Sequence, residues 1–283
     1  MSSPLVSVLM TSYNREKYIA TAIESVLAST YTNLELIIVD DRSKDSTVSI
    51  ANSYADKDDR VRVYVNEQNL GDYKNRNQAA SYAKGKYIKY VDADDYIYPW
   101  GLQILVETLE SFKEAGWGLC SIEQNIDRPF PFQLSPAEAY AYHYEGPGLF
   151  HKAPLSAIIK KSCFDAVGGF SPIRMAGDFD MWHRLAQLYP VVLMPHGIVW
   201  YRKHSEQEMS HYQDYVRVYD KLTLQYLQKS CPLSSEKRSR ILKKKRRQLW
   251  SGVLRNAAKL KFKKAWDVYQ VLQIAKLNYS GNS

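Results

Sequence analysis

The sequence predicts an α/β fold, a Rossmann-like and mostly parallel sheet flanked by helices, with a helical extension at the C-terminal end. Three observations lead to this prediction. Short apolar strands alternate with helix-like segments from residue 5 to residue 95. Three of these strands run directly into polar residues. Beyond residue 212, apolar residues recur at helical spacing almost without interruption. Alternating strands and helices with short connections are typical of a parallel, doubly wound sheet, and the spacing in the tail indicates amphipathic helices.

The elements of the first half follow from their apolar patterns in chain order. We expect strands at 5–10, 34–39, 61–65 and 86–91, and helices at 18–27, 46–54 and 77–83. A mixed segment at 155–159, a helix at 179–188 and a strand at 191–194 follow in the second half. Polar clusters end three strands, at 11–14, 40–41 and 92–95. Ligands of open parallel sheets bind outside the carboxyl ends of the strands, so these clusters predict the position of a binding site.

The composition is that of an ordinary globular protein. Hydrophobic residues make up 45% of the 283 residues and charged residues 24%, and no apolar run reaches the ~20 residues that a membrane-spanning helix needs. The N-terminus lacks the basic region of a signal peptide. The three cysteines, Cys120, Cys163 and Cys231, are far apart and odd in number, which favours buried thiols in a reducing compartment. We therefore expect a cytoplasmic protein.

The positive charge is concentrated in one part of the tail. Residues 237–264 contain 13 Lys and Arg and no Asp or Glu, whereas the rest of the chain has 25 basic and 30 acidic residues. Such asymmetry suggests two tasks in one chain.

Asp92 and Asp94 form an acidic triplet with Ala93 at the end of a strand. Side chains two residues apart in extended chain point the same way, so both carboxylates are expected in one crevice. Hard oxygen ligands beside a diphosphate suit Mn²⁺ or Mg²⁺. A turn or a helix cap is the alternative explanation, because Asp is common in both.

Three segments together resemble family-2 glycosyltransferases with the GT-A fold: VSVLMTSYNREKYIATAIESVLASTYTNLELIIVDDRSKDST, NLGDYKNRNQAASYAKGKYIKYVDADD and GGFSPIRMAGDFDMWHRL. They span about residues 4–205 in the family's order. The resemblance implies an inverting, metal-dependent transferase that uses a nucleotide-diphosphate sugar, with a UDP-sugar favoured. The sugar would be of the hexosyl or N-acetylhexosaminyl type. The acceptor would be a glycan or a lipid-linked glycan in surface polysaccharide synthesis. The chain lacks the Gln-x-x-Arg-Trp motif of processive synthases, so it is expected to add a single sugar.

The resemblance also implies a domain organisation. Residues 1–211 would form the GT-A catalytic domain, with a nucleotide-binding half at 1–95 and an acceptor half at 96–211. Residues 212–283 would form the basic helical extension.

Residues of the first two segments are the expected nucleotide-binding set. Asp41 has a solvent-facing turn as its alternative, and the loop before the metal triplet reads Lys-Asn-Arg-Asn where the family commonly has Ala-Ala-Arg-Asn. Gly71 permits close approach of the backbone to a ligand, and Lys74 or Arg76 is a candidate phosphate contact. The full set is Thr11, Tyr13, Asn14, Asp40, Asp41, Gly71, Lys74, Arg76 and Asp92, with Asp94 as the metal ligand.

The third segment supplies the expected catalytic base. Asp178 matches the first Asp of the family's Glu-Asp-x-Asp-Leu-Trp stretch, and a carboxylate there would take the proton of the acceptor hydroxyl. This chain has Gly177 in place of the preceding acidic residue, so burial must tune the pKa of the base. Asp180 is an acceptor contact or a helix cap. His204, in the stretch Tyr201–His204, is a further metal ligand, or it binds the diphosphate together with Arg202; a structural role is the alternative.

The basic tail, 237–266, predicts attachment to an anionic membrane surface, on the inner face of the cytoplasmic membrane. Its alternatives are packing on the catalytic domain and formation of a homo-oligomer. No motif that reads nucleic-acid bases is present. Two other functions remain open at this stage: a sugar-nucleotide pyrophosphorylase, and a non-catalytic nucleotide-sugar-binding protein tethered by its tail. The first would want a Gly-rich basic loop after the first strand, where this chain has Thr11–Asn14.

Overall fold

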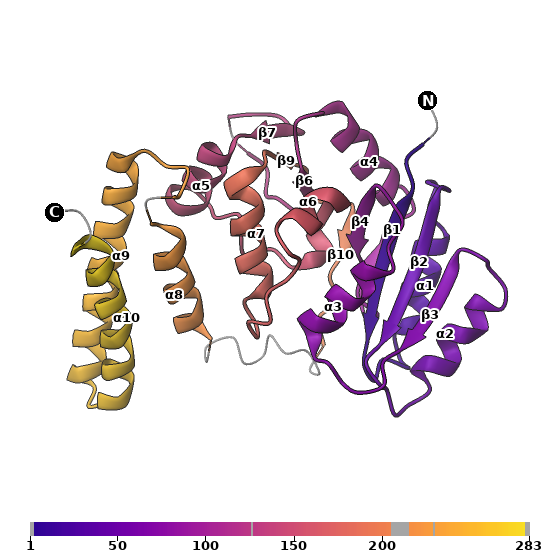
Figure 1. Cartoon of the computed structure of the whole chain (residues 1–283), viewed down its shortest axis with the longest axis horizontal. Coiled ribbons are helices and arrows are strands. Elements are labelled where there is room, and N and C mark those ends of the chain that lie inside the picture. Colours follow the sequence, from indigo (N-terminus) through magenta and orange to yellow (C-terminus); the bar gives the residue numbers. More distant parts are fainter. Residues whose placement is uncertain (1–2, 126, 205–214, 229, 281–283) are drawn as a thin grey trace. The chain divides into compact units, whose positions relative to one another are not determined.

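The computed structural model describes residues 3–125, 127–204, 215–228 and 230–280 (Figure 1). Contacts divide the chain into two compact units, Met1–Ala139 with Leu149–Glu206 and Tyr140–Gly148 with Gln207–Ser283. The boundary predicted at 211–212 lies outside the described residues. Each unit is described by itself below.

The first half of the larger unit follows the predicted alternation of strands and helices. In chain order its elements are β1 (Val6–Ser12), α1 (Ile19–Leu27), β2 (Leu34–Asp40), α2 (Thr47–Ala55), β3 (Val61–Val65), α3 (Asp72–Ser81) and β4 (Tyr87–Tyr90). Helix α3 differs most from its prediction, since it begins five residues earlier than expected, at 72 instead of 77. Its first turn is Asp-Tyr-Lys-Asn, which contains no apolar periodicity by which a helix can be recognised.

The second half completes the sheet. It contains β5 (Tyr96–Ile97), α4 (Gly101–Ser111), β6 (Trp117–Leu119), β7 (Phe132–Leu134), α5 (Pro136–Glu145), η1 (Pro154–Ser156), β8 (Ala157–Lys160), α6 (Lys161–Ala166), α7 (Gly177–Leu188), β9 (Val191–Leu193) and β10 (Val199–Trp200). Among the described residues the strand order of the main sheet is β3-β2-β1-β4-β8-β6-β9-β7. The pairing partners make β8 and β7 antiparallel to their neighbours and leave the other strands parallel to one another. The predicted α/β fold with a mostly parallel sheet is confirmed.

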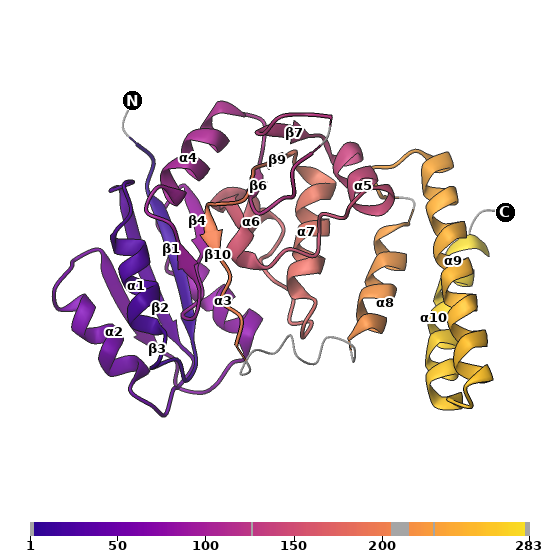
Figure 2. The same cartoon turned by 180° about the vertical axis from the view of Figure 1, so that it is seen from behind.

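The strand order places a topological switch between β1 and β4. The chain moves outward from β1 to β2 and β3, and then returns across β1 to form β4 on its other side. Right-handed connections therefore put α1 and α2 on one face of the sheet and α3 on the opposite face, as the two opposite views show (Figures 1 and 2). The crevice at such a switch is where doubly wound sheets bind ligands. The ends of β1 and β4 are the point at which to look for the site.

Helix α7 is anchored to the sheet by aromatic packing. The rings of Trp117 in β6 and Trp182 in α7 stack with their centroids 5.3 Å apart and their planes 11° from parallel. Both side chains are fully buried, and the indole Nε1 of Trp182 donates to the carbonyl of Lys152 at 2.6 Å. Burial of two such large rings stabilises this contact by several kcal/mol, at ~25 cal/mol per Å² of apolar surface. The first turn of α7 is therefore held on a rigid support.

The smaller unit is helical. It contains α8 (Val216–Tyr226), α9 (Ser235–Ala258) and α10 (Phe262–Ser280), and α9 and α10 lie side by side as a hairpin in both views. Ile241, Leu242 and Leu249 are buried on α9, and Ala265, Val271 and Leu272 on α10. No helix in the described part of the chain is both long enough and apolar enough to cross a membrane. Cys120, Cys163 and Cys231 are free and buried, as predicted.

Candidate active site

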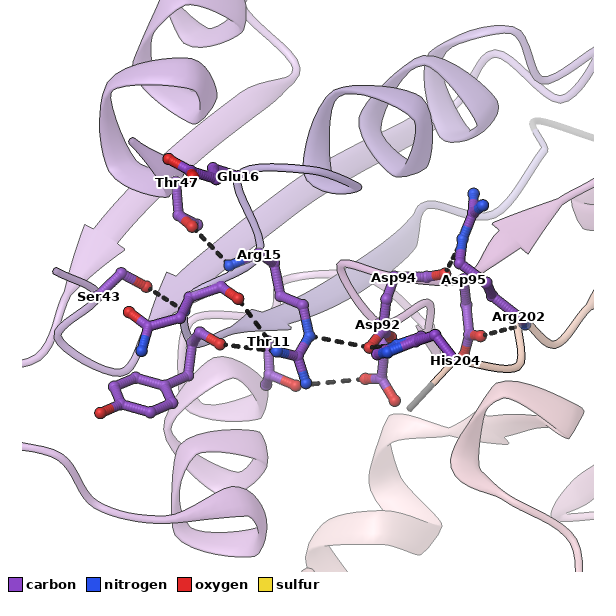
Figure 3. Close-up of polar contacts among 12 residues, drawn as sticks. Thr11, Arg15, Glu16, Ser43, Thr47, Asp92, Asp94, Asp95, Arg202 and His204 are labelled. Carbon is purple, nitrogen blue, oxygen red and sulfur yellow. Dashed lines mark hydrogen bonds and ion pairs between the residues drawn. The ribbon is translucent and has the colours of Figure 1, made fainter. Parts of the chain in front are cut away.

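Thr11 and Asp92 meet at the switch between β1 and β4 (Figure 3). The register pairs Thr11 and Ser12 of β1 with Val39 and Asp40 of β2, and Val91 continues the ladder of β4 by donating to the carbonyl of Leu9 at 3.0 Å. Thr11 Oγ1 then donates to Asp92 Oδ1 at 3.3 Å. The polar clusters that end the first and fourth strands therefore lie side by side.

Asp92 is held by a buried arginine from helix α3. Arg76 donates from Nη1 and Nη2 to the two carboxylate oxygens, at 2.7 and 2.8 Å, and from Nε to Asp72 at 2.8 Å. Only 7% of Arg76 is exposed. The guanidinium expected to meet a phosphate is thus committed to two carboxylates, and it orients Asp92. Lys74, two residues before Arg76 on α3, is exposed.

Two side-chain nitrogen atoms lie within hydrogen-bond distance of one carboxylate oxygen of Asp94 (Figure 3). Arg15 Nε donates to Oδ2 at 2.9 Å, and His204 Nε2 lies 3.0 Å from the same atom. Among the described residues both contacts fall on Oδ2 rather than Oδ1. Arg15 Nη1 also donates to the carbonyls of Tyr13 and Asn14, both at 3.1 Å. The first loop, the acidic triplet and the segment around residue 204 therefore converge on one carboxylate.

Asp95 and Arg202 close the site behind this carboxylate. Asp95 is buried and accepts from the backbone N–H of Arg202 at 3.0 Å, while Arg202 Nε donates to the carbonyl of Asp94 at 2.8 Å. Burial, with the charges of Asp92 and Asp94, raises the pKa of Asp95 to about 8. The guanidinium of Arg202 lies over the rings of Tyr18 and Trp200, 5.1 and 4.8 Å from their centroids.

The acidic pair that ends β2 is bonded inside the protein. Asp40 is 1% exposed and accepts from the hydroxyls of Ser12 and Ser43 and from the backbone of Ser43, at 2.8, 2.5 and 2.6 Å. Asp41, 3% exposed, accepts from Asn66 Nδ2 and from the backbone of Leu70 and Gly71, at 2.9, 2.7 and 2.9 Å. A solvent-facing turn is therefore the wrong description of Asp41. Both carboxylates order the loops that border the crevice.

The remaining expected nucleotide-binding residues lie on these loops. Tyr13 is 42% exposed, so its ring is available to a ligand. Asn14 has a φ of 52° and accepts from the backbone of Lys44 at 2.9 Å, which fixes the loop after β1 against the loop after β2. Gly71 has a φ of 80°, a conformation that favours glycine, and it immediately precedes α3.

Asp178 lies in the first turn of α7, where its side chain is half-buried. Its Oδ1 accepts from the Tyr73 hydroxyl at 3.3 Å and from the backbone N–H of Phe179 at 2.7 Å. Burial is the main cause that raises the pKa of Asp178 to about 7. Two bonds between Asn77 and Phe170, 2.8 and 2.9 Å long, hold the chain before α7 against α3.

Asp180 pairs with Arg184 and does not cap helix α7. The N-cap position of α7 is Ala176, without a side-chain cap. Asp180 Oδ2 instead accepts from Arg184 Nε at 2.8 Å, and Arg184 also donates to the carbonyls of Val167 and Gly169. The pair joins α7 to the turn after α6.

Arg15 and Tyr73 are the two members of the site that sequence reasoning did not single out. Arg15 could have been noticed as the first cation after the strand that leads into the crevice. Tyr73 gives no signal in the sequence, because its contact with Asp178 joins residues that are 105 positions apart.

Comparison with known proteins identifies the family and the fold. The model of glycosyl transferase family 2 matches residues 7–175, more than half of the chain. An uncharacterized glycosyltransferase of Haemophilus influenzae is 41% identical over 97 residues, which cover 34% of this chain and 39% of that protein. The crystal structure of S. aureus TarS 1-349 in complex with UDP-GlcNAc superimposes with a TM-score of 0.66 at 20% identity, over 83% of this chain and 70% of that one.

A second solved structure gives the same fold. The mannosyltransferase PcManGT from Pyrobaculum calidifontis, in complex with GDP-Man and Mn²⁺, has a TM-score of 0.59 at 14% identity and covers 100% of this chain and 89% of that one. At these identities the two structures establish the fold, which is GT-A. The matched segment covers β1, from its second residue, through β4 and the acidic triplet, and it ends at residue 175, within the third segment of the resemblance and before Asp178. The chain therefore belongs to glycosyl transferase family 2.

Proposed function

We propose that this glycosyltransferase transfers a single sugar, with inversion, from a nucleotide-diphosphate sugar to a glycan or lipid-linked glycan acceptor. A UDP-sugar is the favoured donor, the sugar a hexosyl or N-acetylhexosaminyl group, and surface polysaccharide synthesis the process. One observation carries the proposal. Tyr73 and Arg76, one turn apart on α3, bond to Asp178 and Asp92 respectively. Residues three apart share a helix face, so the candidate base and the acidic triplet belong to one site.

Asp94 is the proposed ligand for Mn²⁺ or Mg²⁺. Such ions are usually held in transferases by one or two carboxylates and complete their shell with water and phosphate oxygens. Asp92 is occupied by Arg76, whereas Asp94 has one oxygen outside its contacts with Arg15 and His204 in the described part of the chain. His204 is the proposed second protein ligand.

The donor would lie across the ends of β1 and β4. Tyr13 offers an exposed ring to the base or ribose, and Thr11, Asn14, Asp40, Asp41 and Gly71 build the surrounding loops. Arg15 directly follows Asn14, and Lys74 lies three residues after Gly71. The TarS and PcManGT structures hold UDP-GlcNAc and GDP-Man respectively, which supports a nucleotide-sugar in the corresponding crevice of this chain.

The proposed chemistry assigns the proton to Asp178. Its carboxylate takes the proton of the acceptor hydroxyl as that oxygen attacks the anomeric carbon and the bond to the diphosphate breaks. A pKa of about 7 is suited to a general base at neutral pH. Arg76 and Arg15 hold the carboxylates of the triplet in place during the reaction. The bound metal would offset the charge that grows on the leaving diphosphate.

The helical hairpin is the proposed attachment to an anionic membrane. Arg240, Lys243, Lys244, Arg247 and Arg255 line an open groove of about 560 Å³ along one face of α9. At the turn between α9 and α10, Leu254, Leu260, Phe262 and Trp266 are 67%, 76%, 65% and 59% exposed. Lys259, Lys261, Lys263 and Lys264 lie among them. Exposed aromatic and aliphatic side chains surrounded by lysine are characteristic of a helix that enters the headgroup region. Two of the basic residues already form ion pairs, in Arg240–Glu145 and Lys245–Asp220.

Calorimetric titration with a panel of UDP-, GDP- and dTDP-sugars, with and without Mn²⁺, tests this proposal. One nucleotide class should bind, and its affinity should fall at least tenfold without the metal. Binding of no nucleotide-sugar, or binding that ignores the metal, would contradict it.

A further inference from the structure

Gly177 has no room for a side chain because Tyr73 occupies the space. A Cβ atom at Gly177 would lie 2.7 Å from Cδ2 and 2.8 Å from Cε2 of the Tyr73 ring, and 2.7 Å from the carbonyl oxygen of Ser171. Real Cβ atoms essentially never make contacts this short. Glycine at this position is the departure from the family's acidic residue noted in the sequence. The space that an acidic side chain would need beside Asp178 is taken by an aromatic ring from α3.

The Tyr73 hydroxyl donates a hydrogen bond to the carboxylate of Asp178. The O–O distance to Oδ1 is 3.3 Å. The ring packs against Phe170 with a centroid distance of 5.5 Å, and only 8% of Tyr73 is exposed. A ring held on one side by Phe170 and on the other by the backbone at Gly177 has little freedom to rotate its hydroxyl away. Burial raises the pKa of Tyr73 well above its ordinary value, so the hydroxyl keeps its proton and donates.

We propose that Tyr73 is a positioning residue for Asp178, with its ring seated in the space left by Gly177 and its hydroxyl fixing the carboxylate that faces the acceptor. The inference rests on the proposed role of Asp178 as the base. It assigns to α3 a double task, since Arg76 orients Asp92 from the same helix. The pair Tyr73 and Gly177 replaces, in this chain, the acidic neighbour of the base.

The electrostatic consequence has a definite sign. Besides Tyr73, the side chains that act on Asp178 in the described part of the chain are Asp72, which raises its pKa, and Arg76, which lowers it. A hydrogen bond donated to a carboxylate stabilises the charged form and lowers the pKa. Removal of the hydroxyl therefore raises the pKa of Asp178. Loss of one such bond is expected to shift the value by about half a unit to one unit.

The test is Tyr73→Phe, which removes the hydroxyl and keeps the ring in place. The pKa of Asp178 is measured from the ¹³C carboxyl resonances of the intact protein, with the Asp178 signal assigned by its loss in Asp178→Asn. Tyr82→Phe is the matched control, because Tyr82 ends the same helix with its ring stacked on Tyr64. Tyr73→Phe should raise the pKa by about half a unit or more, and Tyr82→Phe should leave it in place. An unchanged pKa in Tyr73→Phe, or equal shifts in both variants, would overturn the proposal.

This measurement needs no donor and no turnover. Failure of Asp178 as the base would appear instead as an active Asp178→Asn variant, so the two ideas fail in different experiments.

The fit of the ring to the glycine is tested separately by thermal melting of Gly177→Ala in two backgrounds. The close contact of the new Cβ atom with the Ser171 carbonyl is present in both backgrounds, so a difference between the two losses of melting temperature reports the contact with the Tyr73 ring. Gly177→Ala should lower the melting temperature more in the wild-type chain than in Tyr73→Ala. Equal losses in the two backgrounds would show that the ring does not set the need for glycine.

Discussion

Arg76 and Asp92 form a two-pronged ion pair at the centre of the site, with Nη1 and Nη2 of the guanidinium 2.7 and 2.8 Å from the two carboxylate oxygens. The pair joins α3, the helix before β4, to Asp92, which lies two residues after the end of β4. Because Arg76 is buried, the pair must be kept intact. A buried charge left without its partner costs about 3 to 5 kcal/mol. Arg76 therefore acts on the donor site through Asp92, by fixing the direction in which the triplet points.

Arg76→Lys should destabilise the protein, because an ammonium group cannot reproduce the paired bonds to Asp92 and the third bond to Asp72. We expect the free energy of unfolding to fall by about 2 kcal/mol or more in urea denaturation. Arg60→Lys is the matched control. Arg60 also forms a multiple contact with an aspartate, Asp58, but its side chain is 33% exposed, so its replacement should cost less than about 1 kcal/mol. Equal losses of unfolding free energy in the two variants would show that the buried Arg76 pair contributes no more to stability than the more exposed Arg60 pair.

Asp178→Asn should abolish most turnover and leave donor binding nearly unchanged. The amide keeps the size of the side chain but cannot accept the acceptor's proton, so the turnover number should fall by about 10² to 10⁴. Turnover is measured with the donor identified by titration, and donor affinity by calorimetry. Asp180→Asn is the neighbouring control, because Asp180 pairs with Arg184 and should affect stability more than turnover. Loss of activity in Asp180→Asn alone would move the base by two residues.

Asp178→Asn also has a pH-dependent effect on the stability of the protein. The pKa of Asp178 is about 7 in the folded protein and about 3.9 in an unfolded chain. Between these values the folded state keeps a proton that the unfolded state has released, so the folded state loses stability as the pH rises from 4 to 7. Asparagine has no such penalty. Asp178→Asn should therefore melt several degrees higher than the wild type at pH 8, and at nearly the same temperature at pH 4. A variant that is less stable at pH 8 would contradict the burial of an ionised carboxylate.

Replacement of three exposed cations on α9, in Lys243→Gln/Lys244→Gln/Arg247→Gln, should weaken binding to anionic vesicles at least tenfold, since each contributes about 1 kcal/mol at the surface. Co-sedimentation with vesicles of phosphatidylglycerol and phosphatidylcholine measures it, and raised salt should release the wild type. The control removes equal charge from exposed positions of the larger unit, in Lys57→Gln/Lys84→Gln/Lys113→Gln. Equal binding to neutral vesicles, or equal loss in the control, would leave the hairpin as a packing or oligomer element.

Much of the fold and the position of the site were predictable from the sequence, for a physical reason. Buried parallel strands need continuous apolar residues, so β1, β2 and β4 are visible as runs, and the geometry of the sheet gathers their polar ends. Helix α3 was partly missed because its first turn carries site residues instead of an apolar face. The polar residues of this first turn make α3 hard to recognise as a helix, and the same residues contribute contacts to the site.

The partners of each side chain could not be predicted in the same way. Asp40 and Asp41 look like free ligands in the sequence, yet the backbone of Ser43, Leu70 and Gly71 uses their oxygens. The contact between Tyr73 and Asp178 depends on how α3 and α7 approach each other, which no local pattern encodes. Sequence patterns therefore identified many of the residues that gather at the crevice, but not Arg15 or Tyr73, and the three-dimensional packing determines which side chains remain open to a ligand.

The central claim is that Asp94 holds the divalent ion through which this site binds its donor. Calorimetric titration of UDP into the wild type and Asp94→Asn, each with saturating Mn²⁺ and with a chelator, tests it most directly. The wild type should bind UDP more than tenfold more tightly with Mn²⁺, a difference of about 1.4 kcal/mol or more, and Asp94→Asn should lose that difference while it keeps the wild-type melting temperature to within a few degrees. Equal Mn²⁺-dependent affinity in the folded variant would remove Asp94 from the metal site and contradict the account.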